Sequence, residues 1–197
     1  MTIATNRRMT IEEYLNYDDG TDTRYELVDG VLVEMGAEST LNTQIAMFLV
    51  ATFLQLGIPY YRLGIKQKIA VSSREVTARD PDLIVHSHES VQAIEGLKQA
   101  LLDVDMPSPA LVIEVVSPGE PGDKNYDRDY VEKRREYAAR GIAEYWLIDP
   151  HRQVVVVLTL QCQTYQEQRF TEQMAIASPT FPNLNLTAAQ ILNAGKG

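Results

Sequence analysis

The sequence predicts a mixed α/β fold, in which helices pack against the faces of a β-sheet. Two observations lead to this class. Apolar residues recur at helical spacing within residues 41–56, and short apolar runs at 83–85, 111–116 and 144–148 have the length and composition of buried strands. Helices and strands therefore alternate along the chain, and this order indicates a mixed sheet with helices on its faces.

The chain opens with a predicted helix and a predicted hairpin. Thr10 and Glu13 match a capping box, in which each side chain accepts a hydrogen bond from the backbone amide of the other. We therefore expect a short helix that ends near Tyr17. The dipeptide Asp29-Gly30 lies between β-rich runs at 25–28 and 31–35, and it is the strongest short signal for a hairpin turn.

A long helix and further strands are expected next. Ser39 or Thr40 can cap the apolar helical run to about Leu56, and Gly57 can end it. Residues 60–71 have the pattern of one strand or two, and a short apolar strand follows at 81–85. Residues 87–106 fit neither the helical nor the strand period, and a helical excursion is the interpretation we adopt.

The second half of the chain contains the remaining elements, each bounded by a turn or capping signal. They are a strand at 111–116, a helix at 127–140 closed by Gly141, a strand at 144–148, a hairpin at 153–160 and 164–170, and a short helix capped by Thr187. No internal repeat or linker divides this order. We therefore expect a single domain over residues 1–197.

Composition and charge narrow the possible functions. Hydrophobic residues make up 45% of the chain and charged residues 23%, as in ordinary globular proteins. The longest apolar run, at 45–54, is half of the roughly 20 residues that a membrane span needs. There is no signal peptide and only one cysteine, Cys162, so we expect a cytoplasmic protein. The net charge of −9 counts against a protein that coats DNA, but it permits a nuclease whose carboxylates hold metal ions.

Two acidic residues lie where the predicted strands are otherwise apolar. Asp82 opens the run 83–85, and Glu114 interrupts the run 111–116. Either acid alone is better explained by solvent exposure or by a turn. A charged carboxylate in an apolar strand is costly unless it is paired or bound to metal, and two acids on neighbouring strands can share one divalent cation. Oxygen ligands suit Mg²⁺ or Mn²⁺, so the pair favours a metal site.

Several motifs, taken together in their order and spacing, resemble one known family. They are Arg24-Tyr25-Glu26-Leu27-Val28-Asp29-Gly30, Asp80-Pro81-Asp82-Leu83-Ile84-Val85, Val112-Ile113-Glu114-Val115-Val116-Ser117-Pro118, and the stretches 129–137 and 141–150. The chain is similar to the Uma-type restriction endonuclease family, which is common in cyanobacteria and belongs to the PD-(D/E)XK nuclease superfamily. The resemblance covers about residues 9–192. It implies a restriction-endonuclease-like core, in which a mixed β-sheet is flanked by helices.

The resemblance also implies a site and a reaction. Pro81-Asp82 matches the PD element of the superfamily, and Glu114 matches its second acid. The family pattern adds Glu26 as a third acid, although its position on a hairpin strand alone would equally suit an exposed residue. The implied metal ligands are therefore Glu26, Asp82 and Glu114, with Mg²⁺ or Mn²⁺ as the cofactor and nucleic acid, DNA in the first place, as the partner.

One catalytic position departs from the superfamily pattern. Val116 stands where a lysine is expected, two residues after the second acid. The family resemblance assigns the missing charge to Lys133, so that Asp82, Glu114 and Lys133 form the catalytic set. Lys133 shares one face of the predicted helix with Asp129 at i, i+4, and a solvated ion pair between them is the competing interpretation. Lys124, in the preceding loop, is the rival lysine, but a rigid helix positions a catalytic group better.

These observations leave two functions open. The first is metal-dependent endonuclease activity on phosphodiester bonds, which the retained acids favour. The second is a catalytically inactive module with a nuclease fold that binds nucleic acid or another protein, which the missing lysine and the acidic charge favour. Hydrolysis of small phosphate esters has less support, because no glycine-rich phosphate loop is present. We also expect a homodimer, since the apolar run 154–158 suggests a partner surface.

Overall fold

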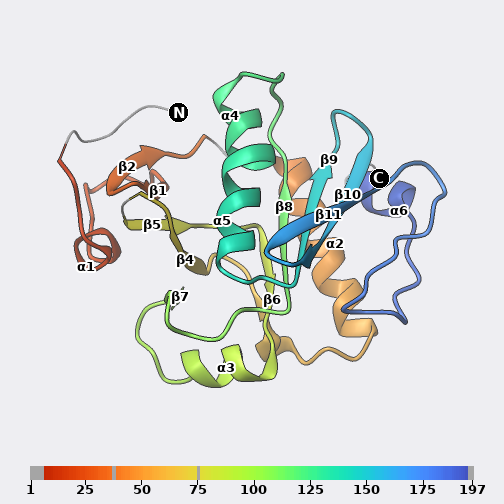
Figure 1. Ribbon diagram of the computed structural model, residues 1–197, viewed down its shortest axis with the longest axis horizontal. Coiled ribbons are helices and arrows are strands. Elements are labelled where there is room, and N and C mark those ends of the chain that lie inside the picture. Colours follow the sequence, from red (N-terminus) through yellow and green to blue (C-terminus); the bar gives the residue numbers. More distant parts are fainter. Residues whose placement is uncertain (1–6, 37–38, 75, 195–197) are drawn as a thin grey trace.

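The computed structural model describes residues 7–36, 39–74 and 76–194. These residues form two mixed β-sheets with helices packed against them, so the predicted mixed α/β class is confirmed (Figure 1). The prediction differs from the structure in the number of sheets. The strands divide into a sheet of five and a sheet of six instead of joining in one.

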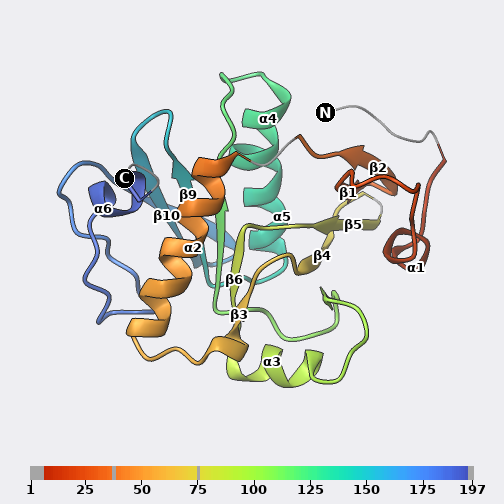
Figure 2. The ribbon, with the colours of Figure 1, turned by 180° about the vertical axis from the view of Figure 1, so that it is seen from behind.

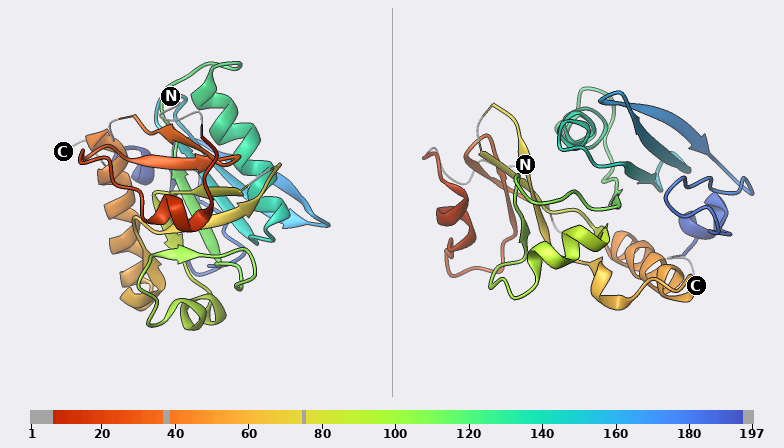
Figure 3. Two further views of the ribbon diagram at one scale, coloured as in Figure 1. Left: turned by 90° about the vertical axis from the view of Figure 1, so that its left-hand side faces the viewer. Right: turned by 60° about the horizontal axis from the view of Figure 1, so that its bottom comes forward.

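The smaller sheet carries the N-terminal part of the chain. Its strands are β1 (Tyr25–Val28), β2 (Val31–Glu34), β4 (Lys68–Ser72), β5 (Val76–Arg79) and β7 (Leu101–Leu102), in the spatial order β2-β1-β5-β4-β7. The predicted hairpin is present, with both residues of Asp29-Gly30 at positive φ. Helix α1 (Ile11–Leu15) has the predicted capping box and packs against this sheet through Tyr14 (Figure 3).

The larger sheet contains the strands in which the two acids were found. Its strands are β3 (Leu63–Gly64), β6 (Leu83–Val85), β8 (Leu111–Val115), β9 (Glu144–Asp149), β10 (Val154–Gln161) and β11 (Thr164–Phe170), in the order β11-β10-β9-β8-β6-β3. The apolar run 154–158 lies within β10 and is buried between β9 and β11. A homodimer therefore stays a prediction, without support from that run.

Helices cover both faces of the larger sheet because its central strands are apolar on both sides. Ile113 and Trp146 face a core shared with α2 (Thr40–Gln55) and α6 (Ala188–Leu192). Val112 faces the opposite core, which is shared with α5 (Lys133–Ala139). Figure 1 shows α5 in front of the sheet, and Figure 2, from behind, shows α2 on the other face. The core under α5 also includes Ile69 of β4, so this helix contacts both sheets.

The helix predicted at 127–140 has an irregular first half. It begins with α4 (Lys124–Tyr126), continues as a π-helical segment η2 (Asp127–Glu132), and becomes regular in α5. The Lys133 amide donates to the Arg128 carbonyl five residues earlier, which is the hydrogen-bond spacing of a π-helix. Such segments are found mostly as single turns inside α-helices, frequently at functional sites.

Other elements refine the predictions. Residues 60–71 contain the 3₁₀ turn η1 (Tyr60–Arg62) and then two strands, β3 and the start of β4. The ambiguous segment 87–106 contains α3 (His88–Ile94) and β7, so it is helical in its first part only. Strand β5 was not predicted. In the described part of the chain, no helix has the length and hydrophobicity that crossing a membrane requires.

Candidate active site

The pairing of β6 with β8 brings the two predicted acids together. Leu83 lies opposite Ile113 in this antiparallel pair, so the next position along the register sets Asp82 opposite Glu114. Directly opposed residues of an antiparallel pair project from the same face of the sheet. Asp82 Oδ2 also accepts a hydrogen bond of 2.7 Å from the Val115 amide, which fixes its carboxylate at the end of β8.

Two side chains of helix α5 contact the Glu114 carboxylate. The Tyr137 hydroxyl donates to Glu114 Oε1 at 2.8 Å, and Lys133 Nζ lies 2.8 Å from Glu114 Oε2. Both side chains come from one face of the helix, since they are four residues apart. The two oxygens of this buried carboxylate therefore each have a donor, and the helix is locked over the strand.

Lys133 is the positive centre of the cluster. It is 2% exposed, and its ammonium lies 3.4 Å from Asp129 Oδ1 and 3.6 Å from Glu26 Oε1, in addition to Glu114. The spacing to Asp129 across η2 is the predicted i, i+4 pair, but the pair is buried and not solvated. Lys124, the rival lysine, is exposed on α4 and lines a different cavity.

Glu26 is held from the opposite side. It is fully buried on β1, where Arg79 donates to its Oε2 at 3.0 Å and the Asp80 amide donates to its Oε1 at 3.2 Å. Arg79 also forms two hydrogen bonds with Glu136 of α5, at 2.7 and 2.8 Å. Glu26 thus contacts Lys133 from within an ion-pair network that joins β1, β5 and α5.

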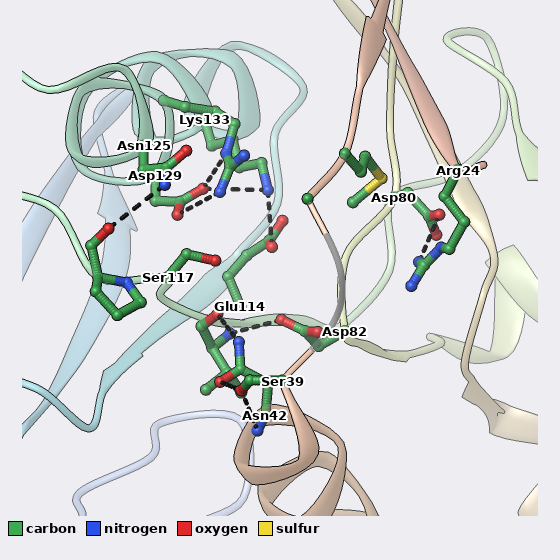
Figure 4. A pocket seen from close by; sticks show the side chains of 15 residues that line it. Arg24, Ser39, Asn42, Asp80, Asp82, Glu114, Ser117, Asn125, Asp129 and Lys133 are labelled. Atoms are coloured by element: carbon green, nitrogen blue, oxygen red, sulfur yellow. Dashed lines mark hydrogen bonds and ion pairs between the residues drawn. The ribbon is translucent and has the colours of Figure 1, made fainter. Parts of the chain in front are cut away.

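A cavity of about 250 Å³ opens beside the cluster (Figure 4). Asp82, Glu114 and Lys133 line it together, whereas Glu26 does not. The charged residues of its wall comprise four carboxylates and three cations, namely Asp80, Asp82, Glu114, Asp129, Arg24, Arg128 and Lys133. The structure therefore brings three of the four predicted site residues to one cavity and sets Glu26 behind Lys133.

The two buried glutamates of the cluster have very different pKa values, because their surroundings differ. Burial raises the pKa of Glu114 to about 8, with support from the Asp82, Asp129 and Glu26 carboxylates, although Lys133 opposes the shift. Burial would also raise the pKa of Glu26, but Lys133 and Arg79 hold it at about 2. Lys133 keeps a pKa above its ordinary value, because the surrounding carboxylates outweigh its burial. Of the two buried glutamates, Glu114, beside the cavity, is therefore the one whose negative charge is less compensated.

Two carboxylates of the cavity wall are of the chemical type that binds a divalent cation. No group of three His, Cys, Asp or Glu side chains is arranged as a metal site among the residues that the structure describes. Asp82 and Glu114 are nevertheless opposed at the cavity, and the raised pKa of Glu114 indicates a surplus of negative charge there. Asp80 Oδ1, in the same wall, is buried without a hydrogen-bond partner. Mg²⁺ is often bound through one or two carboxylates and several waters, so the Asp82 and Glu114 pair fits such an ion.

Several residues of the cluster were not predicted from the sequence. Arg79 and Glu136 are buried partners of the predicted set, and Asp80 shares the cavity wall. Helical spacing alone places Tyr137 on the face of Asp129 and Lys133, but its hydrogen bond to Glu114 was not predicted. One available signal was the pair Glu132 and Glu136 at i, i+4 on the helix, because two acids on one face call for a cation nearby.

The chain is similar to a known protein family and to solved structures. The sequence model of the Uma2 family, described as "Putative restriction endonuclease", matches residues 11–189. A crystal structure from Anabaena variabilis, described as a putative nuclease, has a TM-score of 0.71, with 17% sequence identity over 95% of this chain and 99% of that chain. At this identity the likeness shows the fold. No curated protein matches the chain.

Proposed function

Because the chain belongs to the Uma2 family of putative restriction endonucleases, we propose that it is a metal-dependent endonuclease that hydrolyses phosphodiester bonds in nucleic acid. DNA is the first substrate to test. The observation that carries the proposal is the contact of the Lys133 ammonium with Glu114 at the wall of a cavity that Asp82 also lines. The residue types that the family pattern calls for thus lie together, although they are far apart in the sequence.

In this proposal Asp82 and Glu114 hold the metal ion. When bound, Mg²⁺ or Mn²⁺ polarises a phosphoryl oxygen and lowers the pKa of a coordinated water. The hydrogen bond from the Val115 amide and the one from Tyr137 orient the two carboxylates toward the cavity. Ligation by Glu26 stays a prediction from the family resemblance. Its contacts with Arg79 and Lys133 support a different role, which is to hold Lys133 in place.

Lys133 supplies the positive charge that Val116 does not. Hydrolysis builds negative charge on the phosphoryl oxygens, and an ammonium preorganised at the cavity wall offsets that charge without reorganising. Lys133 is suited to this because three carboxylates hold its position and keep it protonated. It can also orient the attacking water, since an ammonium has three N–H donors.

The inactive-module alternative makes a different prediction for the same protein. It requires binding of nucleic acid without metal-dependent cleavage. Val116 favours this alternative, because it stands where the superfamily lysine is expected, two residues after Glu114. The buried Lys133 beside Glu114 counts against it, because an unused buried charge cluster is costly to keep.

The test is cleavage by matched variants. Labelled single-stranded and duplex oligonucleotides and supercoiled plasmid are incubated with wild type, Asp82→Asn and Asp105→Asn in Mg²⁺, Mn²⁺ or EDTA. Asp105 is an exposed residue outside the cavity, so its variant controls for the same chemical change. We expect metal-dependent cleavage that Asp82→Asn lowers by about a hundredfold or more and Asp105→Asn leaves unchanged.

Calorimetric titration of Mn²⁺ accompanies the cleavage assay. Weaker binding to Asp82→Asn than to Asp105→Asn is the expected result. Equal cleavage by all three proteins would point to a contaminating nuclease. Nucleic-acid binding without cleavage in any metal would establish the inactive-module alternative.

A further inference from the structure

A second and larger cavity adjoins the first. It has a volume of about 500 Å³ and lies between α1, the start of β1, the segment before β4 and the segment before β7. Arg24 and Asp80 line both cavities, so the two spaces share a wall. The volume is in the range of small-molecule sites, and none of the roles proposed above uses this space.

The charges of the second cavity differ from those of the first. Arg24, Lys66 and Lys68 line it together with a single acid, Asp80. This local excess of positive charge is notable in a chain with a net charge of −9. Arg24 pairs with Asp80 Oδ2 at 2.8 Å, and Lys68 Nζ lies 3.9 Å from the same oxygen. Arg24 and Lys68 are therefore held at the shared wall. There they could contact a phosphate of a strand that extends from the first cavity into the second.

Aromatic rings form another part of the second cavity. Tyr17 and Tyr25 are half-buried and meet edge to face, with ring centroids 5.6 Å apart. The Tyr25 hydroxyl donates to Asp19 Oδ2 at 2.6 Å, which fixes that ring. Tyr14 is buried, and its hydroxyl donates to the Tyr25 carbonyl at 2.6 Å. Cations beside fixed aromatic rings are the combination by which proteins bind single-stranded nucleic acid, since the cations track phosphates and the rings stack on bases.

The shared wall also contains an acceptor that lacks a donor. Asp80 Oδ1 is buried and has no hydrogen-bond partner among the described residues. A buried oxygen in this state is costly unless a ligand or water supplies the donor. The amino groups of nucleic-acid bases are such donors, whereas the phosphates and sugar ether oxygens are not.

We propose that the second cavity binds one unpaired nucleotide next to the phosphate that is attacked, so that the strand is single at the point of cleavage. The inference rests on the proposed function and deepens it by naming the class of substrate. A base that enters the cavity to stack on Tyr17 or Tyr25 cannot remain paired in a duplex. Lys66 and Lys68 then contact the backbone of the strand, and Arg24 spans the two cavities.

The test measures binding separately from cleavage. Fluorescence anisotropy follows a labelled oligonucleotide of about 15 nucleotides, as a single strand and as a duplex, binding to the wild-type protein in Ca²⁺. The variants are Tyr17→Ala, Tyr17→Phe and the double variant Lys66→Gln/Lys68→Gln. The matched control is Arg74→Gln/Arg135→Gln, which removes two exposed charges outside the cavity.

We expect the single strand to bind more tightly than the duplex. Tyr17→Ala should weaken single-strand binding by about tenfold, and Tyr17→Phe should restore it, because stacking needs the ring and not the hydroxyl. The lysine double variant should flatten the dependence of log K on log salt by about 1.4, the value for two lost phosphate contacts on a single strand. The arginine control should leave the single-strand affinity and the salt slope nearly unchanged.

Two results would overturn the inference. One is equal affinity for single strand and duplex, with Tyr17→Ala unchanged. The other is equal effects of the lysine and arginine double variants. If Tyr17→Ala does not fold, the comparison of single strand with duplex and the lysine double variant still decide the question. If wild type cleaves nucleic acid but either of these two results is found, the proposed function stands and the nucleotide site is rejected. If binding is as expected but no cleavage occurs in any metal, the nucleotide site stands and the nuclease activity is rejected.

Discussion

Lys133 occupies an environment that few lysines tolerate, because it is almost fully buried and three carboxylates surround its ammonium. The same contacts that keep it charged also keep it immobile. A charge with these properties suits electrostatic catalysis, because its position does not change as the reaction proceeds.

The first prediction concerns Lys133 itself. Lys133→Met should lower the cleavage rate at saturating metal by about a hundredfold or more, because the developing phosphoryl charge loses its ammonium partner. Lys124→Met should change the rate little, because Lys124 lies outside the cavity. Single-turnover kinetics with a labelled strand measure both. Melting curves accompany them, since Lys133→Met also leaves Glu26 and Asp129 without this partner. Equal rates for the two variants would contradict the assignment.

The second prediction concerns the pH dependence of Glu114. Burial raises the pKa of this side chain from 4.5 to about 8 in the metal-free protein. A raised folded-state pKa gives stability that is complete below the unfolded value and is lost as pH rises through the folded value. Glu114 should therefore make metal-free protein progressively less stable between about pH 5 and 8, while affinity for Mn²⁺ rises over the same range as the metal displaces the proton.

Glu114→Gln is the variant that isolates this effect. In EDTA, the thermal stability of wild type should fall relative to that of Glu114→Gln between about pH 5 and 8. Calorimetry should find that Glu114→Gln binds Mn²⁺ weakly at every pH. The comparison matters because burial lowers the pKa of His86 to about 4, which adds an opposite trend between about pH 4 and 6.5 in both proteins. A wild-type curve parallel to that of Glu114→Gln would exclude the predicted titration.

Some residues of the site can be predicted from the sequence and others cannot, depending on how unusual each is in its local sequence. Asp82 and Glu114 could be found because an acid in an apolar strand is conspicuous without knowledge of the fold. Tyr137 could be placed on the helix face of Lys133 by its spacing, but its partner could not be named. Arg79 could not be found, because an arginine near a strand end has many ordinary explanations. The partners of both residues are decided by how α5 docks between the sheets, and that docking leaves no local pattern in the chain.

At the scale of elements, the helix that delivers Lys133 illustrates the same difference. Gly141 predicted where this helix ends, and the structure ends α5 at Ala139. The helical region begins at Lys124, three residues before the predicted start. The π-helical segment η2 was not predicted, because its residues are compatible with an ordinary helix. A wider turn of this kind is favoured by tertiary contacts, here the hydrogen bonds from the Tyr145 hydroxyl to the Asp129 carbonyl and from the Tyr130 hydroxyl to Asp149.

The third prediction tests how β5 is joined to α5. Arg79→Met should lower the free energy of unfolding by about 3–5 kcal/mol, because buried Glu26 and Glu136 lose their guanidinium partner. The double variant Arg79→Met/Glu136→Met should recover part of this loss, because it removes one of the unpaired charges. Arg134→Met is the control, since its pair with Glu167 is partly exposed and should contribute about 0–1 kcal/mol. Urea unfolding curves that coincide for Arg79→Met and Arg134→Met would refute the network.

At the scale of the whole molecule, the two sheets were the main surprise. The class could be predicted because most strands and helices have clear periodicity. The division into two sheets could not, because it depends on β5, which is short, and on pairings between strands distant in sequence such as β1 with β5. These pairings place the hairpin and α1 beside the second cavity, to which the start of the hairpin supplies Arg24 and Tyr25 and α1 supplies Tyr14.

The fourth prediction follows from the net charge of −9. Nucleic acid should bind weakly in EDTA, because the protein repels it at long range and four carboxylates line the first cavity. Ca²⁺ should strengthen the binding of nucleic acid to the wild-type protein by about tenfold at constant ionic strength. The reason is that an ion bound to both the carboxylates and a phosphate couples the binding of the two. Anisotropy titrations with NaCl of matched ionic strength provide the control. The same gain in Asp82→Asn/Glu114→Gln would show that the cation acts elsewhere.

The ion-pair network around Arg79 also bears on how the chain acquires its activity during synthesis. Its members extend from Glu26 near the N-terminus to Glu136, so no early fragment contains them all. A nascent chain that has emerged only as far as Glu114 has the acids but neither Lys133 nor the helix that carries it. The site is therefore completed only after α5 has emerged from the ribosome and docked, and until then the incomplete chain lacks the lysine proposed to act on a phosphodiester bond.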